Sequence, residues 1–178
     1  MKKAKTAEQV LRECGINNRP VSLEKIINHY GIRQVELPAN DDIFGAIMRK
    51  GGDVIIAVNP NQHLHRQRFT LGHELGHYFC HFRDQDELEH VDGDFRVHWR
   101  NSASSEGVNW IEIEANRFAA SLLMPEMLLR SDVESCSALN RDVIQHLALL
   151  YKVSRLAMHY RLIHLGLLPP DVDPSSAA

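Results

Sequence analysis

The chain has 178 residues, of which 44% are hydrophobic and 24% are charged, as in an ordinary soluble globular protein. Its formal net charge of −3 excludes a global positive field that would attract nucleic acid. The three cysteines are odd in number and form no CxxC pair, which argues against a disulfide framework and fits a reducing cytoplasm. No apolar run resembles a signal peptide or a membrane span, so we expect a soluble cytoplasmic protein.

The first third of the chain predicts two short helices and then three strands. Thr6 and Gln9 make a capping box for a helix that ends before Gly15. Ser22 begins a second helix, and Gly31 ends it. The strands are expected at residues 32–37, 43–49 and 54–58, with a hairpin turn at Gly51 and Gly52.

The middle of the chain predicts two helices separated by a long loop. Asn59 and Pro60 are typical of an N-cap and a first helical residue, so a long helix is expected from there to about His81. Residues 83–109 are polar, acidic and without a regular period, which indicates an irregular loop. A second helix is expected from Trp110 to Met124.

The last third predicts two helices, at residues 140–151 and 154–165, joined by a short turn. Such a pair is either a helix-turn-helix that meets DNA or an αα-hairpin that completes the core or docks a protein. The absence of a dense basic patch favours the second interpretation, so direct DNA binding is only weakly supported. The residues expected to pack between the helices are Leu147, Leu150, Val153, Met158 and Leu162.

An HExxH motif at residues 73–77 lies inside the long predicted helix. Residues four apart share one helix face, so His73 and His77 can present both imidazoles to one metal ion. Glu74 is then placed to take a proton from a water on that ion. Gly72 and Gly76 leave a bare strip on which another backbone can pack closely. The plain alternative is a chance match in a chain with eleven histidines.

A zinc hydrolase needs a third protein ligand, and the helix from residue 110 offers Glu112 and Glu114. The apolar residues between 111 and 122 define a buried stripe. Glu112 lies roughly 60° from the centre of that stripe and Glu114 roughly 100° on the other side, so Glu112 is predicted to face inward and Glu114 to be solvated. Asn116 is placed to hydrogen-bond a ligand. Residues left open as a second contact to the metal or an aid to the oxyanion are His81, His90, His98, Tyr151 and Tyr160.

Residues 68–77 and 112–125, with Ala115-Asn116 and Leu122-Leu123-Met124-Pro125, closely resemble the ImmA/IrrE family of metallo-endopeptidases. The resemblance extends over about residues 20–167. It implies a minimal zincin-like α+β fold, in which a small three-stranded sheet covers the HExxH helix. It also implies that His73, His77 and Glu112 bind Zn²⁺ and that Glu74 is the general base; two histidines and a carboxylate would also accept Mn²⁺.

The resemblance further implies an intracellular role, often cleavage of a helix-turn-helix repressor that controls a mobile element, phage or stress response. Some members act with toxin–antitoxin modules. Since the chain stops at residue 178, we expect no additional sensory domain.

The sequence is therefore compatible with two functions. The first is a zinc-dependent endopeptidase whose protein substrate is a DNA-binding repressor, bound as an added strand along residues 54–58. The second is a non-catalytic binding or regulatory protein that retains the fold. The expected organisation is a metallopeptidase domain at residues 1–130, a helical, helix-turn-helix-like segment at 131–168, and a disordered tail at 169–178.

Overall fold

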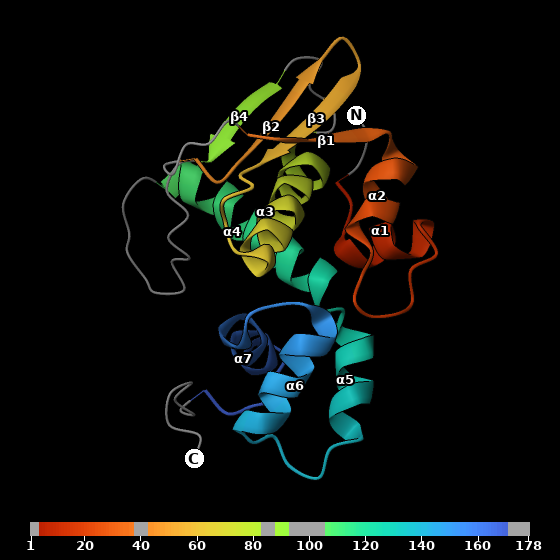
Figure 1. The fold of residues 1–178 in the computed structure, drawn as a ribbon, viewed down its shortest axis with the longest axis vertical. Helices are drawn as coiled ribbons and strands as arrows, with labels where there is room; N and C mark the ends of the chain where they lie inside the picture. Colours follow the sequence, from red (N-terminus) through yellow and green to blue (C-terminus); the bar gives the residue numbers. More distant parts are fainter. Residues whose placement is uncertain (1–3, 38–42, 83–87, 93–105, 171–178) are drawn as a thin grey trace.

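The computed structural model describes residues 4–37, 43–82, 88–92 and 106–170. These residues form an α+β fold in which the sheet lies on one side of helices α3 and α4, and α5, α6 and α7 gather at the opposite end (Figure 1). The elements are α1 (Ala7–Glu13), α2 (Leu23–Tyr30), β1 (Ile32–Glu36), β2 (Gly45–Lys50), β3 (Asp53–Val58), α3 (Leu64–His77), the π-helical turn η1 (Tyr78–Phe82), β4 (Leu88–Asp92), α4 (Glu106–Leu123), α5 (Glu126–Glu134), α6 (Arg141–Tyr151) and α7 (Arg155–His164).

The N-terminal helices begin and end where the sequence predicts. The Thr6 hydroxyl accepts a hydrogen bond from the Gln9 backbone N–H, and the Gln9 side chain accepts one from the Thr6 N–H, which completes the capping box. Ser22 caps α2, and Gly31 ends it in the left-handed conformation at φ 66°. Both helix predictions are confirmed. They could be made from the sequence because capping residues act on the neighbouring backbone and need no tertiary partner.

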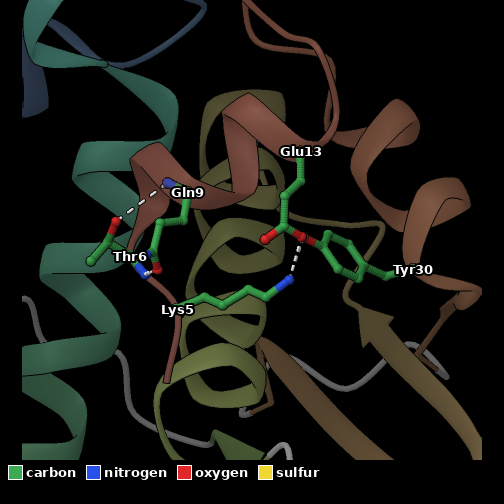
Figure 2. A network of polar contacts seen from close by, with 5 residues as sticks. All are labelled: Lys5, Thr6, Gln9, Glu13 and Tyr30. Atoms are coloured by element: carbon green, nitrogen blue, oxygen red, sulfur yellow. Dashed lines mark hydrogen bonds and ion pairs between the residues drawn. The ribbon is translucent and has the colours of Figure 1, made fainter. Parts of the chain in front are cut away.

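A polar network ties the N-terminal segment to the rest of the fold (Figure 2). The Tyr30 hydroxyl donates to the Glu13 carboxylate at 2.6 Å, and the Lys5 ammonium pairs with the same carboxylate. The Lys5 backbone N–H also donates to the carbonyl of Phe79 at 3.2 Å. The network therefore joins α1 and α2 to the turn that follows α3.

The sheet has four strands in the order β1-β3-β2-β4. β2 and β3 form the predicted hairpin, in which Gly51 and Gly52 have φ of 60° and 94°. β1 runs parallel to β3, and β4 pairs antiparallel with β2, along the other edge of the hairpin. β4 corrects the prediction of an irregular loop at 83–109, as does α4, which begins at residue 106. The remaining loop residues, 83–87 and 93–105, lie outside the described residues.

The helix that carries the HExxH motif begins later than predicted. Asn59 caps no helix: its side-chain oxygen accepts from the Asn61 N–H at 2.9 Å in a turn, and its amide donates to the carbonyl of Ile43 at 2.9 Å. α3 begins at Leu64, with His63 as N-cap. The prediction at residue 59 was wrong because the chemistry that caps a helix also closes a turn of this type.

The core contacts of α3 and α4 use the glycines of the motif region. A Cβ built on Gly76 would lie 2.8 Å from the Cα and the carbonyl oxygen of Ala115, whereas one on Gly72 would meet Ala119 at an ordinary 3.5 Å. The two helices thus approach more closely at Gly76 than at Gly72, along the predicted bare strip.

The C-terminal helices form the predicted pair and one more. Asn140 and Ser154 cap α6 and α7, and Lys152 between them adopts φ 53°. The unpredicted helix α5 directly follows Pro125. Of the residues predicted to pack between α6 and α7, Leu147, Val153, Met158 and Leu162 belong to the buried hydrophobic core, and the partly buried Leu150 packs against it. The predicted disordered tail lies outside the described residues from 171 onward, and none of the described helices has the length and apolar composition needed to span a bilayer.

Candidate metal centre

Two imidazoles and one carboxylate converge between α3 and α4. His73 and His77 lie one turn apart on α3, both fully buried, and their Nε2 atoms are 2.9 Å apart. Glu112 of α4 brings one carboxylate oxygen to 3.2 Å from the His73 Nε2 and the other to 3.3 Å from the His77 Nε2. The Glu112 side chain is 28% exposed, so it is the one donor of the three that solvent reaches.

The donor set suits a transition-metal ion. The ligand atoms of His73, His77 and Glu112 all lie within 4.8 Å of one another, and no other group of three or more such side chains comes this close within the described residues. Zinc binds imidazole nitrogen and carboxylate oxygen at about 2.0–2.2 Å, so one ion can reach all three atoms. Three protein ligands leave a position for water or substrate, as catalytic sites require.

Asn116 determines which nitrogen of His73 faces the site. The side-chain oxygen of Asn116 lies 3.1 Å from the His73 Nδ1. Because an amide oxygen only accepts hydrogen bonds, Nδ1 carries the proton and Nε2 presents its lone pair to the cluster. This contact confirms the predicted hydrogen bond between Asn116 and a candidate ligand.

Phe82 packs against the imidazole ring of the second histidine, His77. The Phe82 and His77 rings are stacked, with centroids 5.7 Å apart and planes 18° apart. Phe82 belongs to η1, whose π-helical geometry follows α3 directly. No periodic pattern in the sequence predicts this contact, since it depends on the local change from α- to π-helix.

Glu74 is fully buried, as are the two histidines of the motif. Its carboxylate lies against the start of β2, where a Cβ on Gly45 would come within 2.6 Å of the Glu74 Oε1. Glu74 thus directly follows His73 in α3, and its carboxylate faces the start of β2. Nothing in the motif alone indicated the contact with Gly45, which is 29 residues earlier in the chain.

Glu114 takes no part in the cluster. Its side chain is 55% exposed, and one of its oxygens lies 3.5 Å from the His81 Nε2. The two glutamates thus diverge as the helical stripe predicted, Glu112 inward and Glu114 outward.

Burial, with Glu114 nearby, raises the pKa of the Cys80 thiol to about 11, so Cys80 stays neutral at pH 7 and offers no thiolate.

The other residues left open by the sequence are dispersed. Tyr151 is buried in the C-terminal helices, where its hydroxyl donates to Asp132 of α5 at 2.6 Å. Tyr160 lies on α7, also in those helices. His90 lies on β4 with its side chain outside the description, and His98 lies outside the described residues.

Comparison with known proteins gives one family and a structural neighbour. The family model for peptidase M78, described as the IrrE N-terminal-like domain, matches residues 45–163. A solved structure described as a Mycobacterium tuberculosis transcriptional regulator superposes with a TM-score of 0.53 and 18% sequence identity over 88% of this chain. This chain spans 44% of that neighbour, and the likeness shows the fold alone. No curated protein matches the sequence significantly.

Proposed function

We propose that this chain, which belongs to the ImmA/IrrE family (peptidase M78, IrrE N-terminal-like domain), is a metal-dependent endopeptidase. The observation that carries the proposal is the convergence of His73, His77 and Glu112 beside a buried Glu74. A Zn²⁺ ion held there, or Mn²⁺ as the alternative, would act as a Lewis acid that activates water and polarises the scissile carbonyl.

Each side chain has a separate task in this scheme. Asn116 fixes the tautomer of His73, and Glu112 supplies a negative charge that partly neutralises the ion. Glu74 accepts a proton from the attacking water and then delivers it to the leaving amine. Its full burial keeps this proton transfer away from bulk solvent.

A substrate segment cannot pair as an added strand with residues 54–58, although the sequence predicted this. Residues 54–58 belong to β3, which pairs with β1 on one side and β2 on the other, so the expected strand addition there is wrong. Among the described strands, β1 and β4 form the edges of the sheet. Asp92 of β4 is the register partner of Gly45, which contacts Glu74, so we place the substrate along the outer edge of β4.

The substrate class is a protein, and we propose a DNA-binding repressor. Leu149 of α6 and Leu156 of α7 are 58% and 51% exposed on either side of the turn at Lys152. Exposed leucines suit contact with a protein more than contact with the phosphates of DNA. The α6–α7 pair would then recognise the repressor while α3 and α4 provide the catalytic side chains.

The alternative function is a regulator that does not cleave. The helix pair with its left-handed residue Lys152 has the connectivity of a helix-turn-helix, and a structural neighbour is described as a transcriptional regulator. This alternative predicts a function that does not depend on Glu74.

The test is cleavage by the zinc-loaded protein in a native bacterial lysate, with new N-termini labelled and identified by mass spectrometry. The wild type is expected to generate a small set of new N-termini, while Glu74→Gln keeps its metal and generates none, because an amide cannot accept the proton. Equal cleavage by Glu74→Gln would contradict the mechanism. No cleavage by a metal-replete wild type would favour the non-catalytic regulator.

A further inference from the structure

We propose that Gly45 is a positioning residue for Glu74, and that its lack of a side chain fixes the direction of the Glu74 carboxylate. This inference rests on the proposed role of Glu74 as the general base. A Cβ on Gly45 would lie 2.6 Å from the Glu74 Oε1 and 3.4 Å from its Cδ. Real Cβ atoms essentially never come within 3.0 Å of such an atom, so the Glu74 carboxylate fills the space that a side chain at position 45 would need.

The backbone at Gly45 is held from several directions. Gly45 is paired in register with Val58 of β3 and with Asp92 of β4. Just before it, the Asn59 side chain donates to the carbonyl of Ile43 at 2.9 Å, and the Asn59 N–H donates to the carbonyl of Phe44 at 3.0 Å. The start of β2 is thus held in the sheet by hydrogen bonds, and it cannot move away from α3 without breaking them.

Asn59 therefore fixes the start of β2 instead of capping a helix. It is completely buried, and it holds residues 43–45 across the helix face that carries Glu74. The contact continues one turn earlier on α3, where a Cβ on Gly45 would come within 2.4 Å of the Thr70 Cγ2. Gly45 is thus closed in by two side chains of α3, one of them the proposed base.

Because both backbones are fixed, an added methyl group must be accommodated by side-chain rotation. Thr70 and Glu74 are the two side chains that could rotate. Replacing Thr70 by Ser removes its Cγ2, so in that background a methyl group at position 45 meets Glu74 alone. Displacement of a reacting group by about 1 Å can cost on the order of 100-fold in rate.

The probe is acetohydroxamic acid binding to the Co²⁺-loaded protein, followed by the visible spectrum of the cobalt. A hydroxamate chelates the metal and hydrogen-bonds a neighbouring carboxylate, so its affinity reports where Glu74 points and needs no substrate. We expect Thr70→Ser/Gly45→Ala to bind one Co²⁺ per chain with the affinity of Thr70→Ser. Its affinity for acetohydroxamic acid should fall at least tenfold, close to that of Glu74→Gln.

Gly72→Ala is the matched control, because its added Cβ meets Ala119 and Leu123 only at ordinary distances of 3.5–3.7 Å. It should bind the probe like the wild type. Unchanged probe affinity in Thr70→Ser/Gly45→Ala, beside a weakened Glu74→Gln, would overturn the positioning role and leave the proposed function standing. Failure of the wild type to bind Co²⁺ would instead overturn the proposed function.

A stability measurement covers the case in which the double variant folds poorly. If its melting temperature falls below that of Thr70→Ser, adding Glu74→Ala should restore it, because the opposing carboxylate is then gone. A melting temperature that Glu74→Ala leaves equally low would show that the added methyl group clashes elsewhere, and would overturn the inference.

Discussion

At the scale of single residues, the hydrogen bond between His73 and Asn116 selects one tautomer of a candidate ligand. The Nδ1 of His73 can serve the site only as a proton donor to Asn116, which leaves Nε2 for the metal. The contact between Asn116 and a candidate ligand could be predicted from the sequence, because Asn116 lies one turn after Glu112 on the same helix. It could not predict Gly45 beside Glu74, since that contact depends on how a distant strand crosses α3.

Replacing Asn116 tests the tautomer argument. Asn116→Ala removes the acceptor of the His73 Nδ1 proton, so we expect the affinity for Zn²⁺ to fall about 10- to 100-fold. Competition with a chromophoric chelator measures the Kd. Asn116→Asp keeps an oxygen acceptor and should retain most of the affinity. Equal Kd values for Asn116→Ala and the wild type would show that His73 is oriented by other contacts.

At the scale of elements, α3 and α4 form a closely packed pair whose separation decides whether Glu112 reaches the histidines. Periodicity predicted both helices, and the stripe on α4 separated Glu112 from Glu114 correctly in direction. The start of α3 and the strand β4 were not predicted. Asn59 and Pro60 carry the same local signal for a cap and for a turn, and the short β4 has an ambiguous pattern that only its pairing with β2 resolves.

The two glycines of α3 test this packing as a matched pair. Gly76→Ala should lower the free energy of unfolding by about 1–3 kcal/mol, because its Cβ would meet the Ala115 backbone at 2.8 Å. Gly72→Ala meets Ala119 at 3.5 Å and should instead gain up to about 1 kcal/mol of helix propensity. Urea denaturation measures both. Equal stabilities for the two variants would contradict the close approach at Gly76.

At the scale of the whole molecule, one hydrophobic core runs from α1 to Leu168 and includes buried residues on both sides of position 130. Polar contacts cross the same position. The buried Arg161 of α7 donates to the carbonyl of Met124 at 3.1 Å, and Arg19 pairs with Asp132 of α5. The division into a peptidase domain and a helical segment at residue 130 stays a prediction. These contacts hold the α6–α7 pair in a fixed relation to α4, which would let one surface recognise a substrate that the other cleaves.

The most direct test of the metal-dependent peptidase is the zinc content of the purified protein beside Glu112→Ala and Glu114→Ala. The two variants remove the same chemical group two residues apart on α4, one from the converging cluster and one from the exposed pair with His81. We expect one tightly held Zn²⁺ per chain in the wild type and in Glu114→Ala, and its loss in Glu112→Ala. A wild type that holds no metal after incubation with Zn²⁺ or Mn²⁺, or a Glu112→Ala variant that keeps it fully, would overturn the proposed metal centre.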